Sequence, residues 1–137
     1  MRKLNPMILI VDDEPYILRS LSFVLKRAGM NILEARNGHD AIETVRRERP
    51  VLVFLDIMMP EKNGYEVCRE IKSDKNLENV YVVLLSAKGQ DIDRKLGLES
   101  GADEYITKPF SPSKIVEKAR AILEKADANA EEEDASK

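Results

Sequence analysis

The hydrophobic positions of this chain follow two alternating patterns. Three runs of five residues, at 7–11 (MILIV), 51–55 (VLVFL) and 81–85 (YVVLL), are continuously apolar. Such runs are typical of strands that are buried on both faces of a parallel sheet. Two weaker candidates, at 31–35 and 104–107, have turn-forming residues close by. The chain therefore predicts five strands.

The segments between these strands have helical periodicity. In the first segment, apolar residues three or four apart extend from Ile17 to Ala28, and Gly29 is the predicted C-terminal stop. The pattern recurs in four more segments, at 41–49, 65–72, 92–100 and 115–123. Regular alternation of strand and helix predicts an α/β fold with right-handed crossovers and helices on both faces of the sheet. We predict a single (βα)5 flavodoxin-like, doubly wound parallel sheet with strand order 2-1-3-4-5.

Length and composition fit one domain with a short tail. The chain has 137 residues, of which 43% are hydrophobic, and this suits a single core. We assign the folded domain to residues 1–125. Residues 126–137 are mainly Ala, Asp, Glu and Asn and carry no apolar stripe. We expect this acidic segment to be a disordered tail or a truncated linker.

Composition also argues against several classes of protein. No apolar run approaches the roughly 18 to 20 residues that cross a bilayer, and Asp12 interrupts the N-terminal run too early for a signal peptide. We therefore expect a cytoplasmic protein. Cys68 is the only cysteine, which excludes an internal disulfide and leaves too few ligands for structural zinc. We interpret it as a buried, inert thiol. The net charge of -3 gives no general attraction for nucleic acid.

Polar residues that can bind a metal ion or a phosphoryl group follow four of the predicted strands. They are Asp12, Asp13, Asp56, Ser86 and Lys108. The carboxyl ends of parallel strands open onto one edge of the sheet, so these side chains are expected to converge in one crevice. Clustered carboxylates repel one another unless a cation lies among them, and Mg²⁺ prefers oxygen ligands. A carboxylate beside such an ion can act as the nucleophile and form an aspartyl phosphate.

Each of these residues also has a simpler interpretation. An Asp-Asp pair after a strand is more often a helix cap than a metal site. Ser86 alone is typical of a loop hydroxyl, and Lys108 alone of a solvated surface charge. Tyr105 is more often packed in the core or at its rim than used as a switch. The order and spacing of all these residues together favour the functional interpretation.

Four motifs carry a resemblance to a known family. They are VDDEP, FLDIMMPEKNGYE, LLSAKG and EYITKPF, in this order along the chain. Together they resemble the receiver domain of two-component response regulators, of the chemotaxis-receiver-like superfamily, over about residues 7–125. The resemblance implies that Asp56 accepts a phosphoryl group from the phosphohistidine of a histidine kinase. It implies a Mg²⁺ site made by Asp13, Asp56 and the main-chain carbonyl of Met58, with Asp12 acting through water.

The resemblance also implies a switch and a limited chemistry. Ser86 and Tyr105 match the family's switch pair, in which the hydroxyl moves toward the phosphoryl group and the aromatic ring turns inward. Lys108, which precedes Pro109, matches the family's conserved lysine. A domain of this kind catalyses only its own phosphorylation and dephosphorylation, so we do not expect an enzyme acting on other substrates.

Three rival functions remain open on the residues alone. A flavin or nucleotide carrier would need a Gly-rich or Ser/Thr-rich loop after the first strand, where this chain has Asp12, Asp13 and Glu14. A phosphatase with an aspartyl intermediate usually has a second aspartate two residues after the nucleophile, where this chain has Met58. A phosphorylation-independent interaction domain would not need the acidic residues, the hydroxyl and the lysine.

The C-terminal half gives an expectation about partners. Residues 93–123 resemble the branch of the family that dimerises through its fourth helix, fifth strand and fifth helix to activate transcription. Glu104 and Lys118 match one charge pair of that dimer, whereas Lys114 stands where an acidic residue is usual. We expect a monomer or weak dimer before phosphorylation. The partners expected are a kinase or phosphotransfer protein and an unknown output protein or domain, with no nucleic acid and no membrane bound by this domain.

Overall fold

The strands form one parallel sheet in the order β2-β1-β3-β4-β5, as predicted. The computed structural model describes residues 6–86, 94–108 and 110–135, without the side chains of Arg94 and of residues 128–135. Within this part of the chain the strands are β1 (Met7–Val11), β2 (Asn31–Ala35), β3 (Leu52–Asp56), β4 (Tyr81–Ser86) and β5 (Glu104–Thr107). Two of them extend one residue further than expected. Asp56 and Ser86 are therefore the last residues of their strands.

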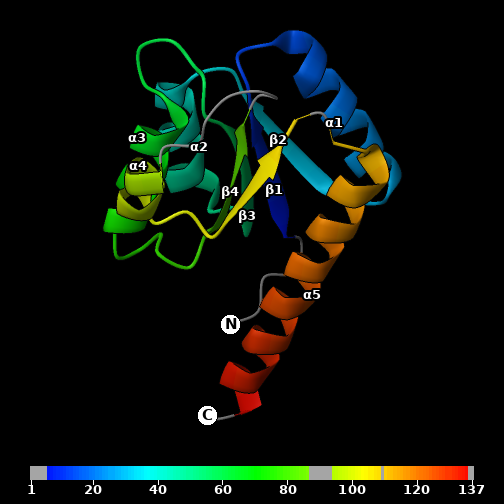
Figure 1. The fold of residues 1–137 in the computed structure, drawn as a ribbon. Coiled ribbons are helices and arrows are strands. Elements are labelled where there is room, and N and C mark those ends of the chain that lie inside the picture. Colours follow the sequence, from blue (N-terminus) through cyan, green and yellow to red (C-terminus); the bar gives the residue numbers. More distant parts are fainter. Residues whose placement is uncertain (1–5, 87–93, 109, 136–137) are drawn as a thin grey trace.

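Helices cover both faces of the sheet (Figure 1). The helices α1 and α5 lie against one face, and α2, α3 and α4 lie against the other. Residues 92 and 93 of the fourth predicted helix fall outside the described residues. The helix bounds are α1 (Pro15–Arg27), α2 (Gly38–Glu48), α3 (Gly64–Ser73), α4 (Arg94–Ser100) and α5 (Pro112–Ala135).

Alternation along the strands divides the core in two. In β1, Ile8 and Ile10 pack with residues of α1 and α5. Leu9 and Val11 pack on the other face with residues of α2 and α3. Because both faces are covered, the central strands are apolar at every position, and this produces the continuous runs in the sequence. Burial of each such side chain contributes about 1.5 to 3 kcal/mol.

Local sequence signals account for the helix ends. After α1, Gly29 has φ 90°, which costs glycine little. The amides of Gly29 and Met30 then donate to the carbonyls of Lys26 and Leu25. At the start of α3, Asn63 and Glu66 form a reciprocal capping box. The predicted stop at Gly29 is confirmed.

The prediction of a disordered tail differs from the structure, in which α5 continues to Ala135. Ala and Glu, which dominate this segment, are strong helix formers. Extending an existing helix also avoids the cost of nucleation, so no apolar stripe is needed for the helix to continue.

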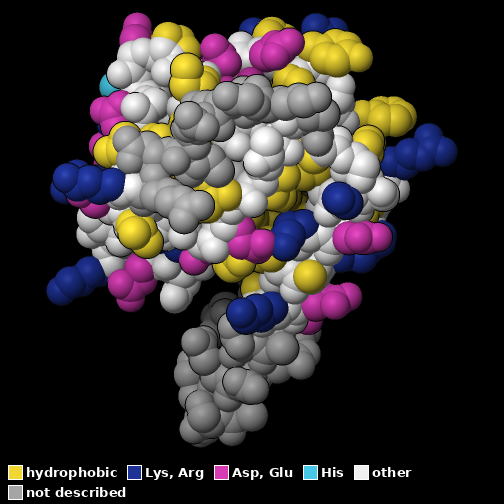
Figure 2. Space-filling model, viewed as in Figure 1, with side chains coloured by type: hydrophobic (Ala, Val, Ile, Leu, Met, Phe, Trp, Pro, Cys, Tyr) yellow, Lys and Arg dark blue, Asp and Glu magenta, His cyan; other side chains and the backbone are white. Residues whose placement is uncertain are grey.

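The described surface is mixed in charge. Figure 2 shows acidic and basic side chains interspersed over the visible face of the domain rather than gathered in one patch. Cys68 is fully buried on α3, as expected, and burial raises the pKa of its thiol to about 11. None of the helices in the described part of the chain has the length and apolar character needed to span a membrane.

Candidate functional site

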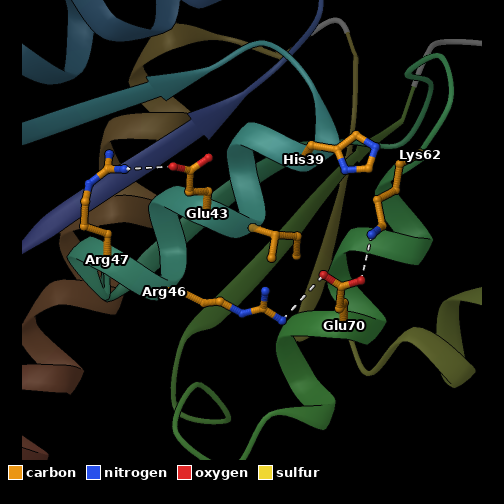
Figure 3. Close-up of a pocket in the computed structure, with 7 residues that line it drawn as sticks. His39, Glu43, Arg46, Arg47, Lys62 and Glu70 are labelled. Carbon is orange, nitrogen blue, oxygen red and sulfur yellow. Dashed lines mark hydrogen bonds and ion pairs between the residues drawn. The ribbon is translucent and has the colours of Figure 1, made fainter.

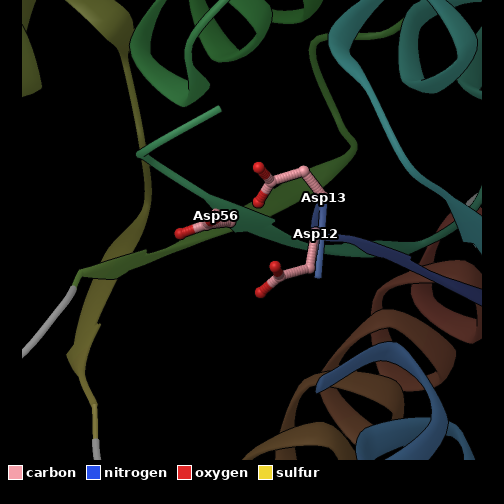
Figure 4. A group of neighbouring side chains, drawn as sticks. All are labelled: Asp12, Asp13 and Asp56. Carbon is pink, nitrogen blue, oxygen red and sulfur yellow. The ribbon is translucent and has the colours of Figure 1, made fainter. Parts of the chain in front are cut away.

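Three carboxylates meet at the carboxyl edge of the sheet (Figure 4). Asp12 and Asp13 directly follow β1, and Asp56 ends the neighbouring strand β3. One oxygen from each carboxylate lies within 4.8 Å of the others. Asp12 and Asp56 are buried, with exposed fractions of 1% and 5%, whereas Asp13 is exposed. The strand order therefore brings together the three acidic residues that the sequence singled out.

Lys108 joins this cluster from the end of β5. Its Nζ lies 3.0 Å from Asp12 Oδ2 and 3.5 Å from Asp56 Oδ1. Burial lowers the pKa of Lys108, but the hydrogen bonds and charges of Asp12 and Asp56 outweigh burial and raise that pKa above its ordinary value. Asp12 Oδ1 also accepts a hydrogen bond of 2.9 Å from the backbone N–H of Glu14, the N-cap of α1. Asp12 therefore belongs to the cluster and also bonds the residue that precedes α1, but neither Asp12 nor Asp13 is the N-cap of that helix.

The Asp56 carboxyl lies in an environment that disfavours its charge. Burial and the charge of Asp12 raise its pKa to about 6, and Asp13 adds to the effect. Lys108 and a hydrogen bond from the backbone of Met58 act in the opposite direction without balancing it. Three carboxylates against one ammonium leave negative charge uncompensated. A cation bound among their oxygens would relieve this repulsion.

Gly64 brings the start of α3 against the backbone that carries Asp56. A Cβ atom at position 64 would lie 2.5 Å from the carbonyl oxygen of Asp56 and 2.7 Å from Cα of Ile57. The Gly64 N–H also donates a 2.9 Å hydrogen bond to the Ile57 carbonyl. The sequence indicated only a helix start here. The structure shows that only glycine allows this close contact beside Asp56.

A row of hydroxyl groups lies on the α3 and α4 side of the sheet. Ser86 is fully buried at the end of β4, and its Oγ donates a long hydrogen bond of 3.4 Å to Thr107 Oγ1 on β5. Leu84 and Tyr105 are paired two residues earlier on the same strands, and Leu84 belongs to this face. Alternation therefore places the Tyr105 ring on the same face as Ser86. Thr107 was not identified from the sequence, because the register that places it across from Ser86 is known only from the structure.

The remaining predicted residues have the following positions. Tyr105 is 37% exposed, and its hydroxyl contacts Gly97 on α4 rather than the acidic cluster. The Met58 side chain is exposed, so any contribution it makes to a metal site comes from its main chain. Pro109 lies outside the described residues. The structure thus brings together Asp12, Asp13, Asp56 and Lys108, while the buried Ser86 and the partly exposed Tyr105 lie outside this cluster, on the face of the sheet covered by α3 and α4.

A separate concavity lies between α2 and α3 (Figure 3). Its volume is about 500 Å³. Each of its lysine and arginine side chains already pairs with a carboxylate, as Lys62 does with Glu70 at 2.7 Å. His39, which is exposed, also lines it. With its cations already paired, this concavity gives no reason to assign a ligand.

Comparison with known proteins identifies the class. The profile of the response regulator receiver domain matches residues 8–120, and the chain belongs to this family. It is 39% identical over 124 residues to the alkaline phosphatase synthesis transcriptional regulatory protein PhoP of Bacillus subtilis, covering 90% of this chain and 51% of that protein. The chain spans about half the length of the curated relatives it matches.

Solved structures agree with this assignment. The receiver domain of a signal transduction histidine kinase from Syntrophus aciditrophicus is 34% identical, with a TM-score of 0.80 over 87% of this chain and 90% of that one. A CheY-like receiver domain protein from Methanospirillum hungatei is 30% identical, with a TM-score of 0.77 over 88% of this chain and 96% of that one. The fold and the class are therefore those of a two-component receiver domain.

Proposed function

We propose that Asp56 accepts a phosphoryl group from the phosphohistidine of a histidine kinase or phosphotransfer protein. The observation that carries this proposal is the buried Asp56 carboxylate, which lies beside two further aspartates and one lysine at the end of a central strand. Its pKa of about 6 leaves it mostly ionised at neutral pH, so the nucleophile needs no separate base.

The phosphoryl group passes from the donor histidine to Asp56 in one step. An Asp56 oxygen forms a bond to phosphorus while the phosphorus–nitrogen bond to the donor histidine breaks. The electron pair returns to the imidazole nitrogen, which can then take up a proton. The Lys108 ammonium is placed to pair with an oxygen of the transferred group, because its Nζ is already 3.5 Å from Asp56.

The donor set fits Mg²⁺, since it consists of clustered carboxylate oxygens with uncompensated charge. We infer that Asp13 and Asp56 would hold the ion directly, with the Met58 carbonyl, and that Asp12 would act through water. When bound, the ion supplies the positive charge that lets phosphoryl oxygens approach these carboxylates.

We further propose that the reaction serves signalling rather than turnover. Met58 stands where a phosphatase of this type would have a second aspartate, so hydrolysis of the aspartyl phosphate is expected to be slow. Ser86 would leave Thr107 and donate its hydrogen bond to the phosphoryl group, and Tyr105 would turn inward. The domain then catalyses only its own phosphorylation and dephosphorylation and changes its partner surface through a population shift.

Intact-mass spectrometry tests the acceptor. The chain is incubated with a small-molecule phosphodonor, with and without Mg²⁺, alongside Asp56→Asn. Asp40→Asn, which removes an exposed carboxylate on α2, is the matched control. We expect one Mg²⁺-dependent phosphoryl adduct in the wild type and the control and none in Asp56→Asn. An adduct that persists in Asp56→Asn would contradict the proposal.

For assembly, we propose a monomer or weak dimer before phosphorylation. Glu104 and Lys118, which match a charge pair of the family's α4-β5-α5 dimer, pair with each other within one chain at 2.5 Å. Sedimentation of the unphosphorylated chain tests this proposal. A tight dimer would overturn it.

A further inference from the structure

The Tyr105 hydroxyl occupies a notch on helix α4. Gly97 lies buried within this helix. A Cβ atom at Gly97 would lie 1.8 Å from the Tyr105 hydroxyl oxygen and 2.8 Å from Cζ, and the three heavy atoms nearest to it all belong to the Tyr105 side chain. The phenol therefore fills the space that any other residue at position 97 would need for its own side chain.

The notch has polar walls that suit a hydroxyl group. Ser100, one turn further along α4, is 2% exposed, and its Oγ donates a 2.6 Å hydrogen bond to the Gly97 carbonyl. Burial and the nearby Tyr65 phenol raise the pKa of Tyr105, and hydrogen bonding with the Ser100 hydroxyl partly offsets them. The Tyr105 hydroxyl is thus held among α3, α4 and β5 although part of its ring is exposed.

We propose that Gly97 is a positioning residue, which seats the Tyr105 hydroxyl against α4 in the unphosphorylated domain. This inference rests on the proposed function, in which Tyr105 turns inward after phosphorylation. In the same structure the Ser86 hydroxyl is hydrogen-bonded to Thr107. The Ser86–Thr107 bond and the Tyr105 ring in the notch therefore belong to the same conformation, that of the unphosphorylated domain. When Tyr105 leaves the notch, α4 loses a packing partner, and this couples the ring to the helix.

Substitution of Gly97 by alanine should act on the seated state alone. The added methyl group meets the far end of a side chain rather than backbone, so the ring can move while α4 keeps its place. Alanine also favours a helix more than glycine does. Loss of the seat is comparable to the net loss of one hydrogen bond, which shifts the equilibrium about fivefold. The apparent affinity for a phosphoryl analogue should rise by that factor, because the state with Tyr105 in the notch, which competes with binding of the analogue, is less populated.

Two measurements test this inference. The chain has four tyrosines and no tryptophan, so tyrosine labelled with ¹³C on the ring gives a simple NMR spectrum in which Tyr105→Phe assigns one resonance. We expect Gly97→Ala to shift that resonance without Mg²⁺ or phosphodonor. Titration with beryllium trifluoride in saturating Mg²⁺ then measures the affinity. Glu99→Ala, an exposed position on the same helix, is the control and should change neither value.

The Tyr105→Leu background decides whether the effect passes through the ring. There, Gly97→Ala should leave the beryllium trifluoride affinity unchanged. An unshifted Tyr105 resonance, or an affinity change that persists without the tyrosine, would overturn the role of Gly97. If the wild type binds no beryllium trifluoride, the proposed function fails, while the NMR comparison still decides whether Gly97 seats the ring.

Discussion

The two ends of the sheet carry charged clusters that differ in charge balance. At the carboxyl edge, burial together with negative charges that outnumber Lys108 raises the pKa of Asp56 to about 6. At the amino edge, Glu104 begins β5, and its carboxylate accepts hydrogen bonds of 2.5 Å from both Tyr81 and Lys118. Burial alone would raise the Glu104 pKa, but Lys118 and Tyr81 outweigh burial and lower it.

The two clusters differ in what their charges do: paired charges at the amino edge stabilise the fold, whereas charges at the carboxyl edge are left uncompensated. The amino-edge cluster joins β4, β5 and α5 with every formal charge paired, so ionisation of Glu104 stabilises the folded state. At the carboxyl edge, ionisation of the cluster destabilises the folded state, and a bound cation would relieve this effect. A buried group whose pKa is shifted in the unfavourable direction is the stronger indication of a site.

Gly64→Ala should have the largest effect on stability, because the added methyl group would clash with the backbone that carries Asp56. The new Cβ atom would lie 2.5 Å from the Asp56 carbonyl oxygen, and backbone cannot move aside cheaply. We expect the free energy of unfolding to fall by about 3 kcal/mol, as in an overpacked core. Urea denaturation measures this loss.

Gly38→Ala is the matched control for Gly64→Ala. A Cβ atom at Gly38 would come closest to Lys62 Cβ and Val67 Cγ2, both at 2.9 Å, which are side-chain atoms rather than the backbone of a central strand. We expect a loss of at most about 1 kcal/mol, offset in part by the helix propensity of alanine. Equal losses in the two variants would show that the backbone of Asp56 is not held by this close contact.

Asp56→Asn should stabilise the metal-free protein by about 2 to 3 kcal/mol at pH 7, because it removes a charge that the folded state disfavours. The folded pKa, about 6, lies above the ordinary value of 3.8. The penalty is therefore fully present above pH 6 and disappears as the pH falls toward 4. Urea denaturation in a chelator at pH 7 and at pH 4 measures the change.

Magnesium sharpens the test of Asp56. A ligand that binds only the folded state stabilises it in proportion to the logarithm of its concentration. The wild type should gain more stability from Mg²⁺ than Asp56→Asn does, so the advantage of the variant shrinks or reverses. A metal-free Asp56→Asn that is less stable than the wild type at pH 7 would contradict the electrostatic argument.

The strands and the acidic cluster could be predicted from sequence for one physical reason. Burial on both faces makes each central strand continuously apolar, and its first polar residue then marks the shared edge of a parallel sheet. Asp12 and Asp56 lie on neighbouring strands as soon as the strand order is known. Lys108 reaches the same edge from β5, which is not a neighbour of β1 or β3. Its spacing in the sequence did not by itself predict contacts with Asp12 and Asp56.

Contacts that depend on how a helix packs against the sheet could not be predicted in this way. The notch at Gly97 and the close contact at Gly64 arise from distances between elements, and no local pattern encodes these distances. Thr107 required the exact register of β4 and β5. The continuation of α5 was missed because the apolar pattern was weighed above the helix propensity of Ala and Glu.

Lys118→Met tests the amino edge and should have the smallest effect. Glu104 keeps its bond from Tyr81 but loses its cation, and both Glu104 and Lys118 are partly exposed. Partly exposed ion pairs contribute about 0.5 to 1 kcal/mol, and we expect a loss of that size at pH 7. Arg47→Met, which breaks more exposed ion pairs on α2, is the control and should change stability less.

The loss of stability caused by Lys118→Met should depend on pH. The folded pKa of Glu104 is lowered, so its contribution is present above its ordinary value of 4.5 and is lost as the pH falls through the folded value. The difference between wild type and Lys118→Met should therefore narrow at low pH because the pair loses its charge. The same acidification relieves Asp56, so the two edges drive stability in opposite directions. A Lys118→Met loss that stays constant as the pH falls would show that the charge of the pair does not join α5 to β5.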